Sequence, residues 1–271
     1  MQVIPTWFVL HQNAIMLLTQ AVLATVITGL LLSRRQKSPA TWLLTGVYGA
    51  LTGFLWSYFM VASAYLITWL TLVGVCIVLL GVMLIQFAYH FPHPSPEQRG
   101  ERRVIRGLSL LALAIQIGLG IAFWRTPTGA LRDRLSLTAI SLALLGLLTA
   151  TLVFARRTVI FTNAELGEMP LGQGGWWRTL WQPVGAAARG TRAFMITCLG
   201  LFALTFVLMS LNLLTQVIPE LYLLSWILLP LGISGFQFTL VLVHLNYAPE
   251  SNSFMVRLIL AALTTMLSVA G

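Results

Sequence analysis

The chain has 271 residues, of which 58% are hydrophobic and only 8% are charged, and its mean hydropathy is +0.88. A water-soluble domain of this size cannot cover its surface with so few charged side chains, so the composition excludes a soluble domain and indicates an integral membrane protein. The net charge of +9 does not indicate nucleic-acid binding, because the sequence has no helix-turn-helix, zinc-finger or RRM signature.

Eight apolar stretches are long enough, or nearly long enough, to cross a membrane as helices. A helix needs about 20 residues to cross about 30 Å of hydrocarbon. The stretches cover residues 13–33, 41–63, 65–90, 107–124, 135–155, 194–215, 221–246 and 254–271. We therefore expect an all-α fold, in which residues 1–271 form a single polytopic membrane bundle of seven to eight transmembrane helices.

The second apolar stretch carries three glycines, Gly46, Gly49 and Gly53, on one helix face, and the last two form a GxxxG motif. Small residues let two helix backbones approach closely. We expect this face to pack against another helix of the same chain rather than to form a dimer interface.

Lys and Arg are distributed unequally between the two sets of connecting segments. Of the 16 basic residues, 13 follow the first, third, fifth and seventh stretches, and three lie in the fourth loop. Because cytoplasmic loops of membrane proteins retain Lys and Arg, we expect an outside N-terminus and odd-numbered loops in the cytoplasm. The N-terminal segment has no basic n-region, so a cleaved signal peptide is not expected.

The third stretch ends in QFAYHFPHPSPEQRGERR, residues 86–103. Pro92 removes a backbone donor and clashes with the preceding turn, which predicts that the helix ends near His90. Two further prolines keep the chain extended. A new helix is expected to begin near Glu97 and to place the following arginines at the level of the lipid headgroups.

The fifth loop, residues 156–193, is the largest that the apolar pattern predicts, and it contains GGWWRTLWQPVGAAARGTR. A short helix in the headgroup plane would place Trp176, Trp177 and Trp181 at the membrane interface and Arg178 against anionic lipid. The alternative is a plain linker whose aromatic side chains pack on helix ends, because the segment is short for an independent amphipathic helix.

No Asp, Glu, Lys or Arg lies in the middle of an apolar stretch. Proton pumps and ion-coupled carriers usually need such residues at that depth, so the pattern speaks against ion-coupled transport. No Walker A, HExxH, GxSxG or CxxC motif is present, so neither an enzyme nor a cofactor is expected in this region. A metal site is not expected either, because the HxxH of His90 and His93 is interrupted by Pro92.

The polar residues that lie at depth are uncharged: Gln20, Gln86, Gln116, Asn212 and Gln237. One interpretation is interhelical hydrogen bonding, which stabilises a bundle by about 0.6–2 kcal/mol for each contact. The other is a ligand pocket between helices, in which the last four of these amides supply the polar contacts and Trp56 supplies an aromatic wall.

Four short segments carry a resemblance to a known family: RRQK at 34–37, LTGFLWSYFM at 51–60, QFAYHFP at 86–92 and LNYAPESNSFMVRL at 245–258. In these segments the chain resembles the multi-helix, typically seven-helix, N-terminal membrane sensor regions of bacterial signalling proteins such as sensor histidine kinases and some nucleotide cyclases. The resemblance implies a location in the plasma (inner) membrane and a kinase or cyclase output domain after the bundle. The sequence departs from that pattern in its eighth apolar stretch.

Two functions remain open. The first is a sensory input module that reads an apolar ligand or a membrane state within the bilayer and passes a signal to an output domain, which we expect beyond Gly271. The second is a structural or transport subunit of a larger membrane complex, which fits the short loops and the many glycines. The lipid bilayer is the expected partner in both. A homodimer, a downstream signalling domain and partner subunits are left open.

Overall fold

The computed structural model describes residues 6–33, 38–64, 69–94, 98–166, 175–214, 228, 232–241 and 243. Within these ranges no strand is present, and six helices are long and apolar enough to cross a membrane. The expected all-α membrane helix bundle is therefore confirmed. Of the last two predicted stretches, 254–271 lies outside the described residues, and 221–246 is described mainly at the short apolar helix Gly232–Val241.

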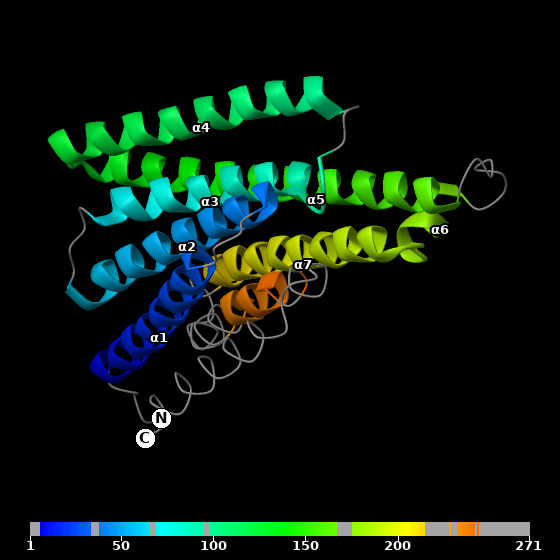
Figure 1. The fold of residues 1–271 in the computed structure, drawn as a ribbon. Coiled ribbons are helices and arrows are strands. Elements are labelled where there is room, and N and C mark those ends of the chain that lie inside the picture. The colour runs from blue at the N-terminus through cyan, green and yellow to red at the C-terminus, as the bar shows by residue number, and fades with distance from the viewer. Residues whose placement is uncertain are drawn as a thin grey trace.

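Seven labelled helices follow one another along the chain: α1 (Thr6–Leu32), α2 (Pro39–Ala64), α3 (Leu70–His90), α4 (Arg99–Arg125), α5 (Gly129–Leu166), α6 (Gly175–Trp181) and α7 (Ala186–Leu214). Figure 1 shows α4 at one edge of the bundle, with α3 and α5 next to it. α3 and α5, which α4 separates in the sequence, pack against each other, and α5 packs in turn against α7. α4 therefore lies outside a central layer that α3 and α5 share.

Glycines allow close approach at two seams of the bundle. Between α3 and α5, a Cβ built on Gly146 would lie 3.2 Å from the Cα atom of Gly81, so a side chain here would push the two helices apart. On α2, a Cβ at Gly46 or Gly53 would meet a sulfur atom of an α3 side chain within 3.0 Å, whereas one at Gly49 would meet nothing within 4 Å. Packing within one chain is thus confirmed for Gly46 and Gly53.

α3 ends at His90, as the following proline predicts, and the backbone N–H of Phe91 caps it by donating to the carbonyl of Phe87. α4 then begins at Arg99, within the basic segment that the sequence places in a new helix. The structure therefore confirms the break between α3 and α4.

The segment 156–193, which the sequence assigns to a loop with one possible short helix, is helical over most of its described residues. α5 continues to Leu166, and α7 already begins at Ala186. An apolar stretch marks the residues at hydrocarbon depth, whereas a helix continues until a Gly or Pro stops it, so the two boundaries need not coincide. Gly185, with φ of 87°, stands directly before α7. In Figure 1 the ends of α5 and α7 extend together past the turn between α3 and α4.

α6 fills part of this projecting end and confirms that the tryptophan segment contains a helix. Leu180 is buried, whereas Trp176, Trp177 and Trp181 are 53%, 57% and 55% exposed. The rings of the first two tryptophans stack with centroids 4.1 Å apart. About half of each tryptophan surface is therefore exposed, and the place of the three tryptophans at a membrane interface stays a prediction.

Candidate functional site

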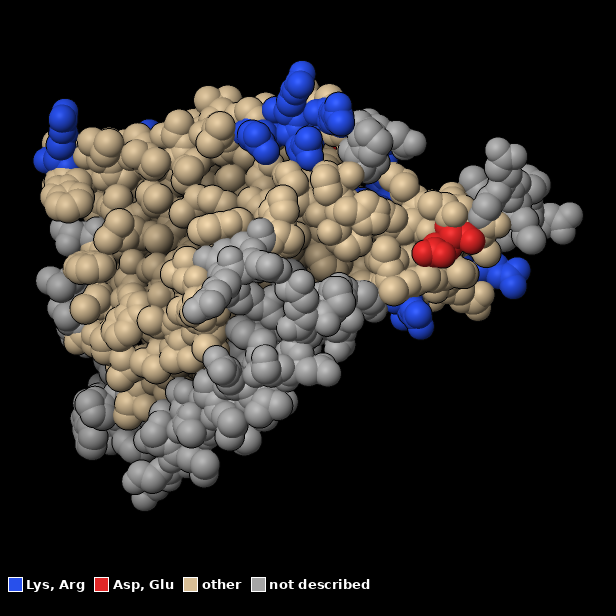
Figure 2. All heavy atoms as spheres, viewed as in Figure 1, with Lys and Arg blue, Asp and Glu red and all other residues tan. Residues whose placement is uncertain are grey.

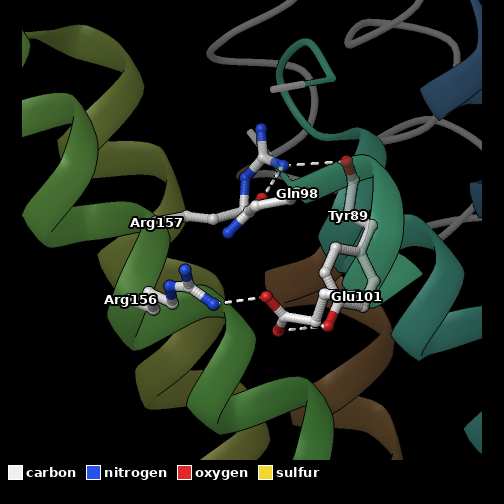
Figure 3. A network of polar contacts seen from close by, with 5 residues as sticks. All are labelled: Tyr89, Gln98, Glu101, Arg156 and Arg157. Atoms are coloured by element: carbon white, nitrogen blue, oxygen red, sulfur yellow. Dashed lines mark hydrogen bonds and ion pairs between the residues drawn. The ribbon is translucent and has the colours of Figure 1, made fainter. Parts of the chain in front are cut away.

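A buried arginine lies where α3 ends and α4 begins. Arg157 of α5 is 1% exposed, and its Nη1 donates to the backbone carbonyl of Tyr89 at 2.8 Å and to Oε1 of Gln98 at 3.2 Å. Its Nη2 donates to the carbonyl of His93. The guanidinium carbon also lies 5.0 Å from the ring centroid of Phe161. Figure 3 shows Arg157 reaching from α5 toward Tyr89 and Gln98.

The break in α3 creates the acceptors that Arg157 uses. The last four carbonyls of a helix have no intrahelical partner, and Pro92 supplies no N–H to the preceding turn. Tyr89 lies in that last turn, and His93 lies in the proline-containing segment after it. Arg157 therefore satisfies carbonyls that this sequence leaves free, and it fastens the end of α3 and the following turn to α5.

Burying a guanidinium is costly unless hydrogen bonds compensate for the lost water. The compensation here is incomplete, because Nε of Arg157 and Nε2 of Gln98 are both buried without a hydrogen-bond partner. The groups that the Arg157 guanidinium contacts on Tyr89, Gln98, His93 and Phe161 are all neutral. Such an arrangement favours a role in fixing the geometry of the helix ends over a role in stability alone.

The neighbouring arginine of α5 ties down the start of α4. Glu101 accepts a hydrogen bond from the Tyr89 hydroxyl at 2.7 Å and forms an ion pair with Arg156. The side chains of this ion pair are 56% and 37% exposed, so the ion pair itself contributes about 0–1 kcal/mol. Arg156 and Arg157 together connect α5 to both α3 and α4, as Figure 3 shows. We call Arg156, Arg157, Tyr89 and Gln98 the arginine cluster.

An aromatic cluster lies beside the arginine cluster and joins α3, α5 and α7. The ring of Phe194 lies 4.7 Å from Phe91, 5.1 Å from Phe87 and 5.3 Å from Phe154, measured between centroids. All four rings are buried. Aromatic pairs at such distances stabilise by about 0.5–1.5 kcal/mol beyond the area that they bury. This end of the bundle is therefore firmly packed.

A cavity of about 160 Å³ lies farther along the same helices. α2, α3, α5, α7 and the helix Gly232–Val241 all contribute to its wall, which includes Leu80 and Gly81 of α3 and Leu147 of α5. Its one polar lining residue among those described is Thr205, whose hydroxyl already donates to the carbonyl of Leu201 at 2.8 Å. Because an engineered apolar cavity of about 150 Å³ holds benzene or xenon, an occupant of this cavity would be a small apolar group.

The structure does not bring together those predicted pocket residues whose side chains it describes. Gln86 lies in α3, one turn before the end of the helix, and accepts a hydrogen bond from Arg106 of α4, whereas Gln116 donates to the carbonyl of Leu135 on α5 at 3.3 Å. These contacts are the interhelical hydrogen bonds of the first interpretation. Neither residue lines the cavity.

The other predicted pocket residues are also separate from the cavity. Gln237 donates to Oε1 of Gln20 at 3.2 Å, and Trp56 donates to the hydroxyl of Thr25 at 3.0 Å. The side chain of Asn212 lies outside the described residues. Trp56 and Gln237 do not line the cavity.

Sequence reasoning missed Arg157, which it assigned to a cytoplasmic loop. A signal was present, because the buried face of α5 continues past the apolar stretch through Phe154, Arg157, Thr158 and Phe161 at helical spacing. A lone charge on such a face predicts a buried, hydrogen-bonded group. Among the described residues no three His, Cys, Asp or Glu side chains gather into a candidate metal site.

Comparisons of the chain with protein-family models, with curated proteins and with solved structures find no match. We therefore infer function from the geometry of the cavity and of the arginine cluster.

Proposed function

We propose that this chain is a membrane sensory input module, which responds to an apolar ligand or a membrane state and passes a conformational signal to an output domain. One observation carries the proposal: two of the helices that line the apolar cavity, α3 and α5, are the same two that Arg157 joins beyond it. A change in the spacing of α3 and α5 at the cavity would therefore alter the contacts of the arginine cluster.

The proposed module sits in the plasma (inner) membrane with its N-terminus outside. The distribution of 13 against three basic residues supports this orientation. In it, the arginine cluster and the projecting ends of α5 and α7 lie on the cytoplasmic side, where an output domain would receive the signal.

The ligand class follows from the cavity wall. The described lining side chains are apolar apart from Thr205, whose hydroxyl is already hydrogen-bonded. A charged or strongly polar ligand would lose its water there without gaining a partner. The matching occupant is a small apolar molecule or the end of a hydrocarbon chain.

The response rests on differential binding to two spacings of α3 and α5. A ligand shifts an equilibrium only as far as its affinities for the two states differ. The backbones of α3 and α5 are in close contact at Gly81 and Gly146, and Gly81 also lines the cavity. An occupant that separates the two helices would pull Tyr89 away from Arg157, and its absence would restore that contact.

The test is a distance measurement between spin labels on the purified protein in nanodiscs. Gly100→Cys on α4 and Ala164→Cys on α5 place labels at two exposed positions, with Cys76 and Cys198 replaced by alanine. Benzene should shift the distance distribution by about 1–2 Å, the size of helix shifts in known switches. Ala143→Leu, which fills the cavity, should abolish the response, and Ala203→Leu on an exposed face of α7 should leave it intact.

A distribution that benzene leaves unchanged in the parent protein contradicts the proposal and favours the structural or transport subunit. A response that survives Ala143→Leu shows that benzene acts elsewhere, and it contradicts the cavity as the sensing site.

A further inference from the structure

Four arginines gather on the first two turns of α4. Arg99, Arg102, Arg103 and Arg106 follow the spacing i, i+3, i+4 and i+7, which places them on one side of the helix. Figure 2 shows Lys and Arg side chains grouped over this end of α4, with no Asp or Glu beside them in that view. The group forms a concentrated positive patch at the end of an apolar helix.

This charge is not neutralised within the described part of the chain. Glu101 is the one acidic residue of α4, and Tyr89 and Arg156 already engage its carboxylate. No ion pair between described residues includes any of the four arginines. The patch therefore keeps its charge available for an external anion.

Two of the four arginines turn toward the last turn of α3. Nη1 of Arg102 lies 3.4 Å from Nε2 of His90, and Nε of Arg106 donates to Oε1 of Gln86 at 3.4 Å. Both distances are long for hydrogen bonds, so these guanidinium groups have capacity for a better acceptor. We call Gln86, His90, Arg102 and Arg106 the α3–α4 corner.

Gln86 supplies the second observation that points to a ligand. Its side chain is only 6% exposed, and its Nε2 is buried without a hydrogen-bond partner. A buried donor left unpaired costs about 1–3 kcal/mol. The corner thus combines two guanidinium groups with a buried, unpaired amide N–H, and its four residues include no carboxylate, which suits an anion with several oxygens.

The helix face below the arginines is apolar, and it is exposed at Leu110 and Ile117, whereas Leu113 between them packs against the core cluster that includes Val78. Leu110, Leu113 and Ile117 follow Arg106 at i+4, i+7 and i+11, so they continue its side of the helix. Leu110 is 56% exposed and Ile117 is 41% exposed. Positive charge above and apolar surface below match an amphiphile whose headgroup carries phosphate and whose chains lie along α4.

We propose that the α3–α4 corner binds the phosphate of an anionic phospholipid, with Arg102, Arg106 and the Gln86 amide as donors and the Leu110–Ile117 face as the seat of an acyl chain. Guanidinium groups bind phosphate oxygens through paired, charge-assisted hydrogen bonds. A zwitterionic lipid carries an extra cation that the four arginines repel, so the corner selects lipids with net negative charge. The site is independent of the cavity and of the signalling role.

The test measures lipid binding to the purified full chain by native mass spectrometry during titration with phosphatidylglycerol. Arg102→Gln combined with Arg106→Gln should weaken the first bound lipid by about 30-fold, since each basic side chain near an anionic lipid contributes about 1 kcal/mol. Arg99→Gln combined with Arg103→Gln removes the same charge from the same helix and should weaken it less than about threefold, because the contacts with α3 are made by Arg102 and Arg106.

Three results would overturn the site. Equal losses in the two double variants would show diffuse attraction to the patch. Equally tight binding of phosphatidylcholine would show that the corner does not select lipids by the charge of the headgroup. Saturable binding of inorganic phosphate at the affinity of the lipid would assign the corner to a soluble anion.

Gln86→Met keeps the volume of the side chain and all four arginines. A loss of phosphatidylglycerol binding in this variant supports the site even where a double arginine variant fails to fold. Unchanged binding contradicts the role of Gln86.

Discussion

Nη1 of Arg157 donates to the backbone carbonyl of Tyr89 at 2.8 Å, although the two residues are 68 positions apart in the sequence. The contact binds the last turn of α3 to a part of α5 that lies past its apolar stretch. Arg157 is almost fully buried, whereas its neighbour Arg156 is exposed in an ion pair with Glu101. Adjacent arginines of one helix thus have very different surroundings.

That difference predicts unequal effects of the same substitution. Arg157→Met should lower the free energy of unfolding by about 3 kcal/mol, because it leaves buried carbonyls without a donor. Arg156→Met should lower it by less than about 1 kcal/mol, as for an exposed ion pair. Steric trapping in bicelles measures both values. Equal losses would mean that the burial of Arg157 has no energetic consequence.

The glycine seam between α3 and α5 predicts a second contrast. Gly146→Val should destabilise the bundle by about 1–3 kcal/mol through overpacking, because its Cβ would press on the backbone of Gly81. Gly118→Val on α4 carries the same change in helix propensity, but a Cβ there meets nothing within 4 Å. The difference between the two variants isolates the packing term. If they unfold alike, α3 and α5 do not depend on this contact.

The sequence predicts the bundle and the end of α3 well, because apolar length and Pro92 act locally. It fails for Arg157, because a charge at the end of an apolar stretch is the usual mark of the headgroup region. It also fails to group the deep amides. Depth along a helix follows from position in the apolar stretch, whereas the direction in which Gln86 or Gln116 points depends on how the helices rotate and pack.

The exposed tryptophans of α6 should lie in a lipid interface. Lipids brominated near the headgroup should quench the fluorescence of Trp176, Trp177 and Trp181, because arginines beside them favour anionic lipid. Replacing all three with alanine should reduce that quenching. Trp124→Phe, in the last turn of α4, replaces a tryptophan that is 67% exposed and serves as a control. If the triple replacement leaves the quenching unchanged and lowers only quenching by acrylamide, the tryptophans face water.

The orientation of the chain predicts which engineered cysteines react in intact cells. Gly129→Cys, at the first residue of α5, should react with a membrane-impermeant maleimide, whereas Ala164→Cys near the end of α5 should react only after lysis. Both positions are exposed in the bundle, so burial does not explain a difference. The reverse pattern would invert the proposed topology and place the arginine cluster outside.

The last prediction tests whether α3 and α5 carry a signal from the cavity to the arginine cluster. Ala143 lines the cavity and lies on α5, about 21 Å along the helix from Arg157 at about 1.5 Å per residue. Substitutions this far apart usually have additive effects within about 0.3–0.5 kcal/mol. If the cavity and the cluster bias one shared equilibrium, Ala143→Leu and Arg157→Met should deviate from additivity by about 1 kcal/mol in a double-mutant cycle. Pairing Arg157→Met with Ala203→Leu gives the matched control, which should be additive. Additivity in both cycles would leave the cavity and the cluster as independent features of one bundle, and it would remove the mechanical basis of the proposed sensor.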